Sequence, residues 1–323
     1  MHIPTVLTLF LSALPALSSP LKKRVSRTTA PAGCLTIGAS NASHSTLSSA
    51  LNALGASGGA ACIFMHAGTY TEQVTLNYSG GLTIYGETTD SSTYAQNTVT
   101  ITHTISSPDA GGLDKSSTVN IVADGVALYN INISNGYGKG AQAVALTANA
   151  DRLGFYACAF SGYQDTLYAK HGTQYYSNSH IVGAKDYVFG AAAAWFGECV
   201  LESIGQGTIT ASSREADSPE NTWYVFDHST VTGASDLDGK VYLGRPWRVL
   251  ARVAFQNSKL GAVVNKAGWK PMAEGATPAF YEFNNEGAGA DTGEREYLSE
   301  LAAAVDRETV LGSDALSWID TSY

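Results

Sequence analysis

Polar residues that could carry out acid–base chemistry recur at nearly constant spacing in the middle of the chain. Gln142 is followed by the pair Gln164–Asp165 and then by Asp186, at intervals of about 21 residues, which is within the range of repeats that form solenoids. If the chain winds into coils of this length, these side chains stack on neighbouring rungs about 5 Å apart. Two carboxylates at that distance do not both ionise freely, so one pKa rises and the other falls. Such a pair suits a charged nucleophile beside a protonated general acid.

A basic residue and two amides complete this candidate site. Arg245 is the cation expected near the aspartates, because a guanidinium can hold a carboxylate through two parallel hydrogen bonds. Gln142 and Gln164 offer neutral donors for a developing oxyanion. Taken singly, an aspartate before a turn usually shapes that turn. The repeated spacing and the basic partner together favour catalysis.

The segments that must position these residues are short runs of β-branched and aromatic side chains, which are typical of strands. The predicted strands after residue 60 are 82–85, 99–102, 119–122, 128–133, 143–147, 154–160, 174–181 and 195–201. The last of them recur about every 21 residues without intervening helices, which indicates a solenoid. We therefore predict an all-β fold, a single-stranded parallel β-helix, with a β-sandwich as the alternative.

Helices are expected only towards the ends of the chain. Residues 45–54 are typical of a short N-terminal helix. Apolar residues also recur at helical spacing within 294–305, namely Tyr297, Leu298, Leu301 and Val305. We expect this C-terminal helical segment to pack on the solenoid. No linker separates it, so residues 25–323 are predicted to form a single domain.

The four cysteines predict one disulfide bond and two free thiols. Cys34 and Cys62 each begin a short predicted strand, and neighbouring strands would bring their sulfurs within bridging reach. Aligning the repeats places Cys158 opposite Ser179, with Cys199 one repeat later. Two rungs span roughly 9–10 Å, which exceeds the reach of a disulfide. Cys158 and Cys199 are therefore predicted to be stacked, buried and unpaired.

Composition excludes several classes of protein. Hydrophobic residues make up 44% of the chain and charged residues 15%, which excludes a disordered chain. Lys and Arg number 19 against 28 Asp and Glu, so the formal net charge is −9 and a nucleic-acid partner is not expected. No segment beyond the N-terminal leader has the length and apolarity of a membrane helix, so no membrane partner is expected either.

Residues 1–24 have the pattern of a secretory leader. Residues 1–19 contain an apolar run followed by small residues, as a signal peptide does, with a buried N-terminal helix as the alternative. Residues 20–24 end in Lys-Lys-Arg and are interpreted as a basic processing segment. Removal of these three basic residues changes the formal charge from −9 to −12. We expect a secreted, extracellular monomer, with glycosylation acceptors at Asn41, Asn77 and Asn132.

Five sequence blocks, found in the expected order, resemble those of pectin methylesterases of the carbohydrate-esterase type. The blocks are 68–72, 142–146, 163–167, 186–190 and 243–247, and the resemblance extends from about residue 36 to residue 269. It implies a right-handed parallel β-helix. It also implies a fungal esterase that removes the C6 methyl esters of homogalacturonan, the polymer of pectin, and releases methanol and pectate. The resemblance implies no metal and no organic cofactor.

The resemblance also implies a role for each site residue. Asp186 would be the nucleophile and Asp165 the general acid and then the general base, with an acyl-enzyme between the two steps. Gln142 and Gln164 would stabilise the oxyanion, and Arg245 would hold Asp186. The implied sugar-binding residues are Trp247, Tyr168, Tyr187, Trp269 and Thr69. Tyr187 departs from the phenylalanine that is usual after the nucleophile, which would alter the groove wall.

Three other functions remain open from the sequence. The segment Gly55–Gly59 matches the nucleophile elbow of serine esterases around Ser57, but a helix-like run precedes it and a strand follows, the reverse of the required order. A pectin-degrading lyase or hydrolase could use the same solenoid, although no acidic cluster suited to calcium is present. A carbohydrate-binding solenoid without activity is the third alternative.

Overall fold

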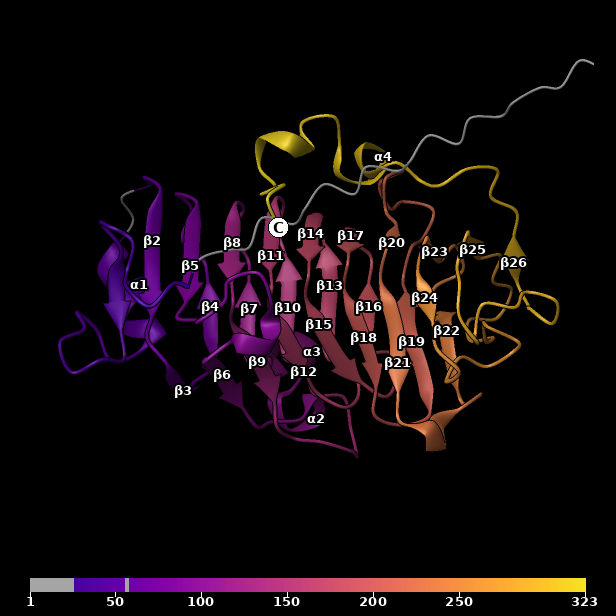
Figure 1. Cartoon of the computed structure of the whole chain (residues 1–323), viewed down its shortest axis with the longest axis horizontal. Coiled ribbons are helices and arrows are strands. Elements are labelled where there is room, and N and C mark those ends of the chain that lie inside the picture. The colour runs from indigo at the N-terminus through magenta and orange to yellow at the C-terminus, as the bar shows by residue number, and fades with distance from the viewer. Residues whose placement is uncertain (1–25, 56–57) are drawn as a thin grey trace, which may run out of the picture.

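Short strands follow one another in a stack that runs the length of the molecule (Figure 1). The computed structural model describes residues 26–55 and 58–323, so the leader expected at residues 1–24 and Ser57 lie outside the described residues. All the paired strands are parallel and form three sheets. The chain passes from one sheet to the next in turn, for example from β11 to β12 to β13 to β14. The described residues therefore form a parallel β-helix, as predicted.

Eleven strands form the longest sheet. In spatial order they are β1 (Leu35–Ile37), β2 (Ala61–Met65), β5 (Leu82–Gly86), β8 (Val126–Tyr129), β11 (Leu153–Tyr156), β14 (Thr173–Ser177), β17 (Ala193–Gly197), β20 (Tyr224–Asp227), β23 (Arg252–Gln256), β25 (Ala279–Phe283) and β26 (Leu298–Ser299).

Two further sheets complete each coil. The seven-stranded sheet has the order β22 (Val241–Pro246), β19 (Gly207–Ser212), β16 (Val188–Gly190), β13 (Leu167–His171), β10 (Leu146–Asn149), β7 (Val119–Ile121) and β4 (Val74–Leu76). The eight-stranded sheet has the order β24 (Lys259–Leu260), β21 (Thr230–Gly233), β18 (Val200–Ser203), β15 (His180–Gly183), β12 (Ala159–Ser161), β9 (Asn132–Asn135), β6 (Val99–His103) and β3 (Gly68–Thr71).

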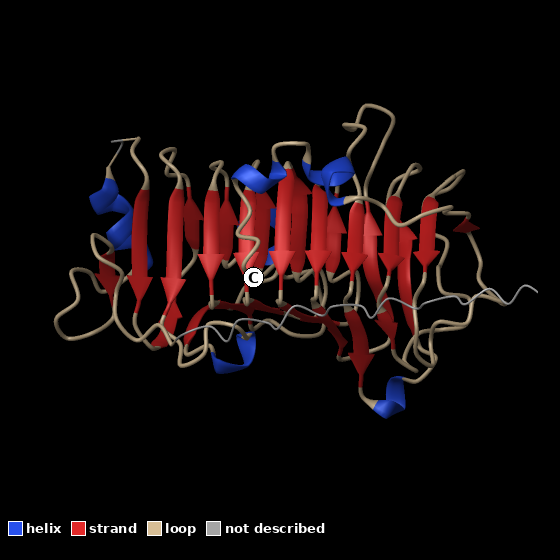
Figure 2. Cartoon of the chain, turned by 45° about the horizontal axis from the view of Figure 1, so that its top comes forward, coloured by secondary structure: helices blue, strands red, loops and turns tan. Residues whose placement is uncertain are grey.

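Helices are short and lie around the strands (Figure 2). They are α1 (Leu47–Leu54), α2 (Ser107–Ala110), α3 (Leu113–Ser116) and α4 (Arg307–Leu311), with 3₁₀ turns η1 (Tyr94–Gln96), η2 (Ser235–Leu237) and η3 (Ala315–Ser317). The N-terminal helix α1 is confirmed within the predicted range. Thr46 caps it by accepting a hydrogen bond from the backbone N–H of Ser49.

The predicted C-terminal helix at 294–305 is wrong. Leu298 instead pairs with Phe280 as part of β26, and the helical turn α4 begins only at Arg307. The backbone of Val305 is bound by the side chain of Gln256, which donates to its carbonyl (3.1 Å) and accepts from its N–H (2.8 Å). The solenoid thus satisfies the backbone polar groups of Val305, which need no helical hydrogen bonds.

Several runs that the sequence predicts as single strands are two strands joined at a sharp corner. Asn130, Ala157, Asn178 and Glu198 each lie at such a corner with a positive φ of 48–54°. The corner residue turns the chain from the eleven-stranded sheet to the eight-stranded sheet. These four coils therefore bend at the same place, which keeps their rungs in register.

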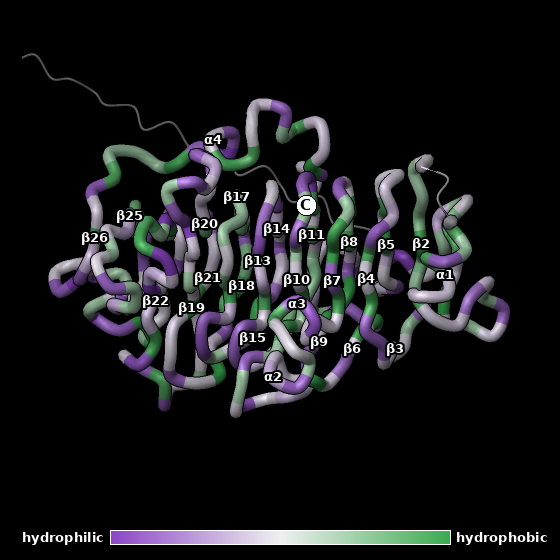
Figure 3. Tube along the Cα trace, turned by 180° about the vertical axis from the view of Figure 1, so that it is seen from behind, coloured by the Kyte–Doolittle hydropathy of each residue, from purple (hydrophilic) through white to green (hydrophobic). Residues whose placement is uncertain are grey.

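The core is continuous along the stack, and hydrophobic residues recur in its strands over the length of the molecule (Figure 3). Aromatic rings of adjacent rungs stack at centroid distances of 4.5–4.6 Å, in the order Phe155, Tyr176, Phe196, Phe226 and Phe255. Such a ladder stabilises neighbouring rungs in the same way at every step.

The cysteine predictions are confirmed. Cys34 and Cys62 form a disulfide bond, with their Cα atoms 4.6 Å apart. Cys158 and Cys199 are buried and free. Ser179 lies between them on the intervening rung and accepts a hydrogen bond from the N–H of Cys158 (3.1 Å). Burial raises the pKa of both free thiols to about 12, so they remain protonated.

Candidate active site

Two aspartates lie at equivalent corners of adjacent rungs. Asp165 comes two residues before β13 and Asp186 two residues before β16, and these strands pair with Leu167 opposite Val188. Both aspartates have a positive φ, 64° and 51°. Their backbone N–H groups donate to the next rung, from Asp165 to the carbonyl of Lys185 (3.0 Å) and from Asp186 to that of Thr208 (2.7 Å). The parallel register therefore brings the two carboxyl groups side by side, about one rung spacing apart.

Asp186 is held by three hydrogen-bond donors. Arg245 donates from Nε to one carboxylate oxygen (2.9 Å) and from Nη2 to the other (2.5 Å). The hydroxyl of Thr208 donates to the first oxygen (2.5 Å). This paired geometry supplies positive charge to the carboxylate and fixes its plane. Hydrogen bonding to Asp186 also raises the pKa of Arg245 above its ordinary value.

Asp165 lies in a different environment from its neighbour. Its side chain is buried, and burial, followed by the negative charge of Asp186, raises its pKa to about 8. Lys185 and Arg245 oppose that rise but do not cancel it. At neutral pH Asp165 therefore keeps its proton, next to a carboxylate that faces a guanidinium. One member of the pair can give a proton away, and the other can attack as an anion.

The two carboxyl groups open into a cavity of about 240 Å³. Its lining contains all five predicted catalytic residues and the predicted Trp247, in the set Leu113, Gln142, Gln164, Asp165, Lys185, Asp186, Phe189, Ala211, Arg245, Trp247 and Met272. Tyr168 lies against this wall, with its ring stacked on Phe189 at 4.3 Å. The site thus combines two carboxyl groups, two side-chain amides and an aromatic wall.

Of the five predicted sugar-binding residues, only Trp247 is in the lining of the cavity. Tyr168 is stacked on the lining residue Phe189, and the other three lie farther away. Tyr187 is fully buried, and its hydroxyl hydrogen-bonds to Ser203 (3.0 Å). Its side chain therefore points into the core and not into the cavity. Trp269 is also fully buried, stacked on Phe280 at 4.1 Å. The prediction that these two rings line the groove is wrong. Thr69 is exposed on β3, in the eight-stranded sheet, outside the lining of the cavity.

Some residues of the site were missed by the sequence analysis. Thr208 follows Asp186 by one coil, so the same repeat that relates the aspartates would have found it. Phe189 lies within the block 186–190 but was assigned no role. Lys185, Leu113, Ala211 and Met272 carry no signal in the sequence that would place them there. Ala211 lies between Phe189 and Arg245 in register, and its small side chain leaves room for the guanidinium to reach Asp186.

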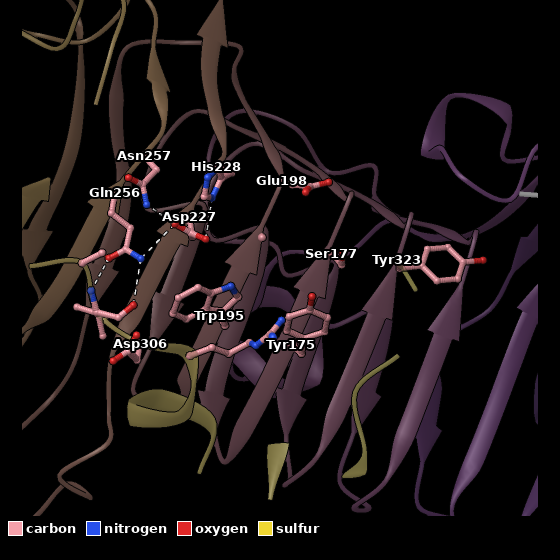
Figure 4. A pocket seen from close by; sticks show the side chains of 14 residues that line it. Tyr175, Ser177, Trp195, Glu198, Asp227, His228, Gln256, Asn257, Asp306 and Tyr323 are labelled. Carbon is pink, nitrogen blue, oxygen red and sulfur yellow. Dashed lines mark hydrogen bonds and ion pairs between the residues drawn. The ribbon is translucent and has the colours of Figure 1, made fainter. Parts of the chain in front are cut away.

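A separate cavity of about 450 Å³ lies on the eleven-stranded sheet, beneath the C-terminal segment (Figure 4). Several of its polar groups bind one another. Asp227 accepts hydrogen bonds from Gln256 (3.1 Å) and Asn257 (2.9 Å), and its other oxygen contacts His228 (2.9 Å). Because Gln256 also holds the backbone of Val305, this network anchors the C-terminal segment.

No group of three or more His, Cys, Asp or Glu side chains in residues 26–55 and 58–323 is arranged to hold a metal ion. Over the same residues, no helix has the length and apolar character needed to cross a membrane.

Comparisons with known proteins agree on one family. The family model described as pectinesterase matches residues 36–320. Pectinesterase A of Emericella nidulans is 59% identical, over all of both chains. The structure of the pectin methylesterase from Aspergillus niger superposes with a TM-score of 0.90 and 62% identity, over 92% of this chain and all of that one. The pectin methylesterase from carrot gives a TM-score of 0.80 at 27% identity, over 91% and 96% of the two chains.

Proposed function

The chain belongs to the pectinesterase family and is a carboxylic ester hydrolase with pectin methylesterase function, and from that premise we propose that Asp186 and Asp165 divide the chemistry of ester hydrolysis between them. One observation carries the proposal. In a single cavity, a carboxylate held by Arg245 and Thr208 lies next to a carboxyl group whose pKa is raised to about 8. That is the arrangement needed for a nucleophile and a general acid at neutral pH.

The first half of the reaction forms an acyl-enzyme. An oxygen of Asp186 attacks the C6 carbonyl carbon of a methylated galacturonate unit, and the carbonyl oxygen gains the negative charge. The side-chain amides of Gln142 and Gln164 line the cavity and donate hydrogen bonds to this oxyanion. When the intermediate collapses, the bond to the methoxy oxygen breaks and Asp165 donates its proton to that oxygen. Methanol leaves, and Asp186 is joined to the substrate as an anhydride.

The second half of the reaction releases the acid. Asp165, now an anion, takes a proton from a water molecule that attacks the carbonyl carbon of the anhydride. The bond to Asp186 breaks, Asp186 becomes a carboxylate again, and Arg245 supplies the opposite charge for it. Asp165 regains its proton, so both side chains return to their starting states. Methyl ester and water are consumed, and methanol and galacturonic acid are produced; the acid then releases its proton to solvent and becomes galacturonate.

Trp247 and Tyr168 are the aromatic residues that we assign to substrate binding. Trp247 lines the cavity, and the ring of Tyr168 supports Phe189, which also lines it. Flat apolar faces of this kind suit the apolar face of a sugar ring and the methyl group of an ester. This part of the site would therefore accept the esterified, uncharged unit.

Methanol release from methylated pectin by wild-type protein and by Asp186→Asn tests the assignment. The amide cannot attack the ester, so we expect a loss of at least about 10⁴-fold in kcat. Asp217→Asn, at an exposed loop position, is the matched control and should retain wild-type kcat. If Asp186→Asn folds normally and keeps more than a tenth of the activity, Asp186 is not the nucleophile.

The same assay separates the alternatives left open by the sequence. A lyase or hydrolase would shorten the polymer, whereas the esterase releases methanol without chain cleavage. A serine esterase would be inhibited by a serine-directed phosphonate, and the aspartyl mechanism predicts resistance. Around Gly55, helix α1 comes first and strand β2 follows, which is the reverse of a nucleophile elbow.

The location and assembly of the protein belong to the same proposal. The disulfide between Cys34 and Cys62 is typical of an oxidising compartment, which supports secretion of the enzyme. The leader expected at residues 1–24 would be removed on the way. We assign the mature enzyme a monomeric state outside the cell, and size-exclusion chromatography of the secreted protein tests both points.

A further inference from the structure

The cavity of about 450 Å³ beneath the C-terminal segment is separate from the catalytic cavity (Figure 4). The two linings share no residue. Its floor comes from β14, β17, β20 and β23 of the eleven-stranded sheet, and residues 304–307 of the C-terminal segment close one side. Its volume lies within the range of about 300–1,000 Å³ that small-molecule sites occupy. The space is therefore large enough for a sugar unit.

The floor of this cavity has an aromatic row beside a polar row. In parallel register, Tyr175 of β14 pairs with Trp195 of β17. Two residues further along these strands, Ser177 pairs with Gly197, which pairs in turn with Asp227 of β20. Residues two apart in a strand point to the same face, so both rows face the cavity. Figure 4 accordingly shows Trp195 between Tyr175 and Asp227.

Trp195 brings an unused hydrogen-bond donor to this floor. Its side chain is only 6% exposed, yet the indole N–H has no acceptor within residues 26–55 and 58–323. A Cβ atom at Gly197 would lie 3.4 Å from the indole nitrogen, so the glycine leaves a gap in the polar row in front of it. The indole N–H of a buried tryptophan usually has a partner. This donor therefore indicates a ligand that accepts a hydrogen bond.

Two free carboxylates also line the cavity. The side chains of Glu198 and Asp306 form no ion pair or hydrogen bond in the part of the chain that the structure describes. Asp227 is different, because it already contacts His228 (2.9 Å). The guanidinium of Arg307 lies over the ring of Tyr175, 5.7 Å from its centroid. The unpaired charges of the lining are therefore two carboxylates and one guanidinium, so the cavity has an excess of negative charge.

These features together fit an uncharged, hydroxyl-rich ligand. Hydroxyl groups both donate and accept, so one can accept from the indole N–H while others donate to carboxylates. Hydrogen bonds to a charged acceptor are stronger than those between neutral groups. The same negative charge disfavours an anionic sugar such as galacturonate. A neutral sugar satisfies the free donor and the free acceptors at once.

We propose that this cavity binds a neutral sugar unit of a polysaccharide, on a different sheet of the solenoid from the catalytic cavity. Trp195 donates to a sugar hydroxyl, and Glu198 and Asp306 supply acceptors. The inference goes beyond the proposed function and does not depend on it. A protein attached to a polysaccharide network through this cavity would keep its catalytic cavity at a high effective concentration of polymer.

Binding is measured by ligand-observed NMR titration of the wild-type protein. The probes are three neutral tetramers, of galactose, arabinose and glucose, with a galacturonate tetramer as the charged comparison. Because a single bound sugar unit has few atoms, we expect a dissociation constant on the order of 1 mM for at least one neutral tetramer. If none of the three binds at about 10 mM, the proposal is wrong.

Two variants place the sugar in this cavity. Gly197→Ala fills the gap in front of Trp195, and Gly197 has no positive φ that an alanine would strain. We expect the neutral tetramer to bind at least about tenfold more weakly, because the added methyl group occupies the place of the sugar hydroxyl. Trp195→Phe keeps an aromatic ring but removes the N–H, so we expect a loss of about three- to tenfold.

Trp223→Phe is the matched control. Trp223 packs against the same outer cluster of the eleven-stranded sheet but lies outside the lining of the cavity, so this variant should bind the tetramer as the wild type does. An unchanged kcat for methanol release shows that each variant is folded. Gly197→Ala removes no atom from the protein and remains decisive if Trp195→Phe does not fold.

Two results would overturn the site. Wild-type affinity for the neutral tetramer in folded Gly197→Ala or Trp195→Phe would place the sugar elsewhere. The galacturonate tetramer should bind equally to the wild type and to Gly197→Ala. A parallel loss of its binding would show that the cavity takes an anionic sugar. Neither result depends on which residues carry out ester hydrolysis, so the proposed function is tested separately.

Discussion

Asp165 and Asp186 have the same chemical group but different surroundings, and that difference can be tested through pH. Burial and the charge of Asp186 raise the pKa of Asp165 to about 8. Because the first step needs the protonated acid, kcat/KM for methanol release should fall as pH rises through about 8. A rate that stays constant to pH 10 would contradict the role of Asp165 as the acid.

Replacing Asp165 with asparagine should reduce activity and increase stability together. The amide cannot transfer a proton, so we expect a loss of about 10²–10⁴-fold in kcat. The raised pKa means that the folded state binds a proton which the unfolded state releases above about pH 4. The wild-type protein therefore loses stability as pH rises from about 4 to about 8. Asp165→Asn avoids this loss, so we expect its free energy of unfolding at neutral pH to exceed that of the wild type by on the order of a few kcal/mol.

Denaturant unfolding at pH 5 and pH 7.5 measures this effect. The stability gain of Asp165→Asn over the wild type should be larger at pH 7.5 than at pH 5. An equal gain at both values would show that the ionisation of Asp165 does not oppose folding. The measurement is independent of the kinetic assay, so it tests the pKa of Asp165 separately from its role.

Arg245 acts through geometry as well as charge, and a conservative substitution distinguishes the two. Arg245→Lys keeps a positive charge but offers a single point of contact in place of the two parallel bonds to Asp186. A misplaced nucleophile lowers the rate of attack, so we expect kcat to fall about 10²-fold with a small change in KM. Arg152→Lys is the matched control, because Arg152 pairs with Asp314 in exposed surroundings outside the catalytic cavity, and it should retain wild-type kcat. Wild-type kcat in Arg245→Lys would refute the positioning role.

The sequence predicted the reacting groups better than their surroundings. Asp165, Asp186 and Gln164 follow from a spacing that parallel register preserves from one rung to the next. Arg245 was found as the cation of a matching block, although 59 residues separate it from Asp186. Tyr187 and Trp269 were misplaced because aromatic residues suit both a sugar face and a core, and only the direction of the side chain decides between them.

At the scale of elements, the corners between the eleven-stranded and eight-stranded sheets determine how well the coils stack. In the described residues, three of the six corner residues with positive φ are asparagines, which tolerate this conformation better than most other residues; they are Asn130, Asn178 and Asn257. Glu198 occupies the same corner with φ 54° and an exposed side chain. Its backbone strain is not compensated by side-chain burial.

Replacing Glu198 with asparagine should therefore stabilise the protein. We expect about 0.5–1 kcal/mol, or a rise of roughly 2 °C in Tm for a chain of this length. Glu300→Asn removes the same charge at an exposed position without positive φ and is the control. Thermal unfolding measures both variants. A similar rise in the two variants would attribute the effect to charge rather than to the corner.

These corners also explain where the prediction of elements failed. The run 154–160 was predicted as one strand, but Ala157 turns the chain with φ 50° and splits it into β11 and β12. Alanine gives no sequence signal for a left-handed corner, whereas an asparagine at an equivalent position does. The helical spacing at 294–305 was misleading for a related reason. The free edge of β25 pairs with Leu298 and so satisfies the backbone of a segment whose pattern alone favours a helix.

At the scale of the whole molecule, the two ends of the described chain meet over the middle of the eleven-stranded sheet. After β26 the C-terminal segment turns back along the stack and ends near β11 (Figure 1). Arg27 donates to the hydroxyl of Tyr323 (3.0 Å) and to the side chain of Asn130 (3.1 Å). Its guanidinium also lies over the ring of Tyr85 at 4.7 Å. One residue thus links the N-terminal end, two rungs of the solenoid and the last residue.

Removing this link should loosen the C-terminal segment without unfolding the solenoid. Arg27→Ala loses partly buried hydrogen bonds and a cation–π contact, so we expect about 1–3 kcal/mol less protection of the amides in residues 305–323 in hydrogen exchange. Arg152→Ala is the matched control, because Arg152 also binds this segment, through Asp314 (3.1 Å), but both side chains are more than half exposed. An exposed pair of this kind contributes about 0–1 kcal/mol. Equal loss of protection in the two variants would mean that the buried cluster around Arg27 does not hold the segment in place.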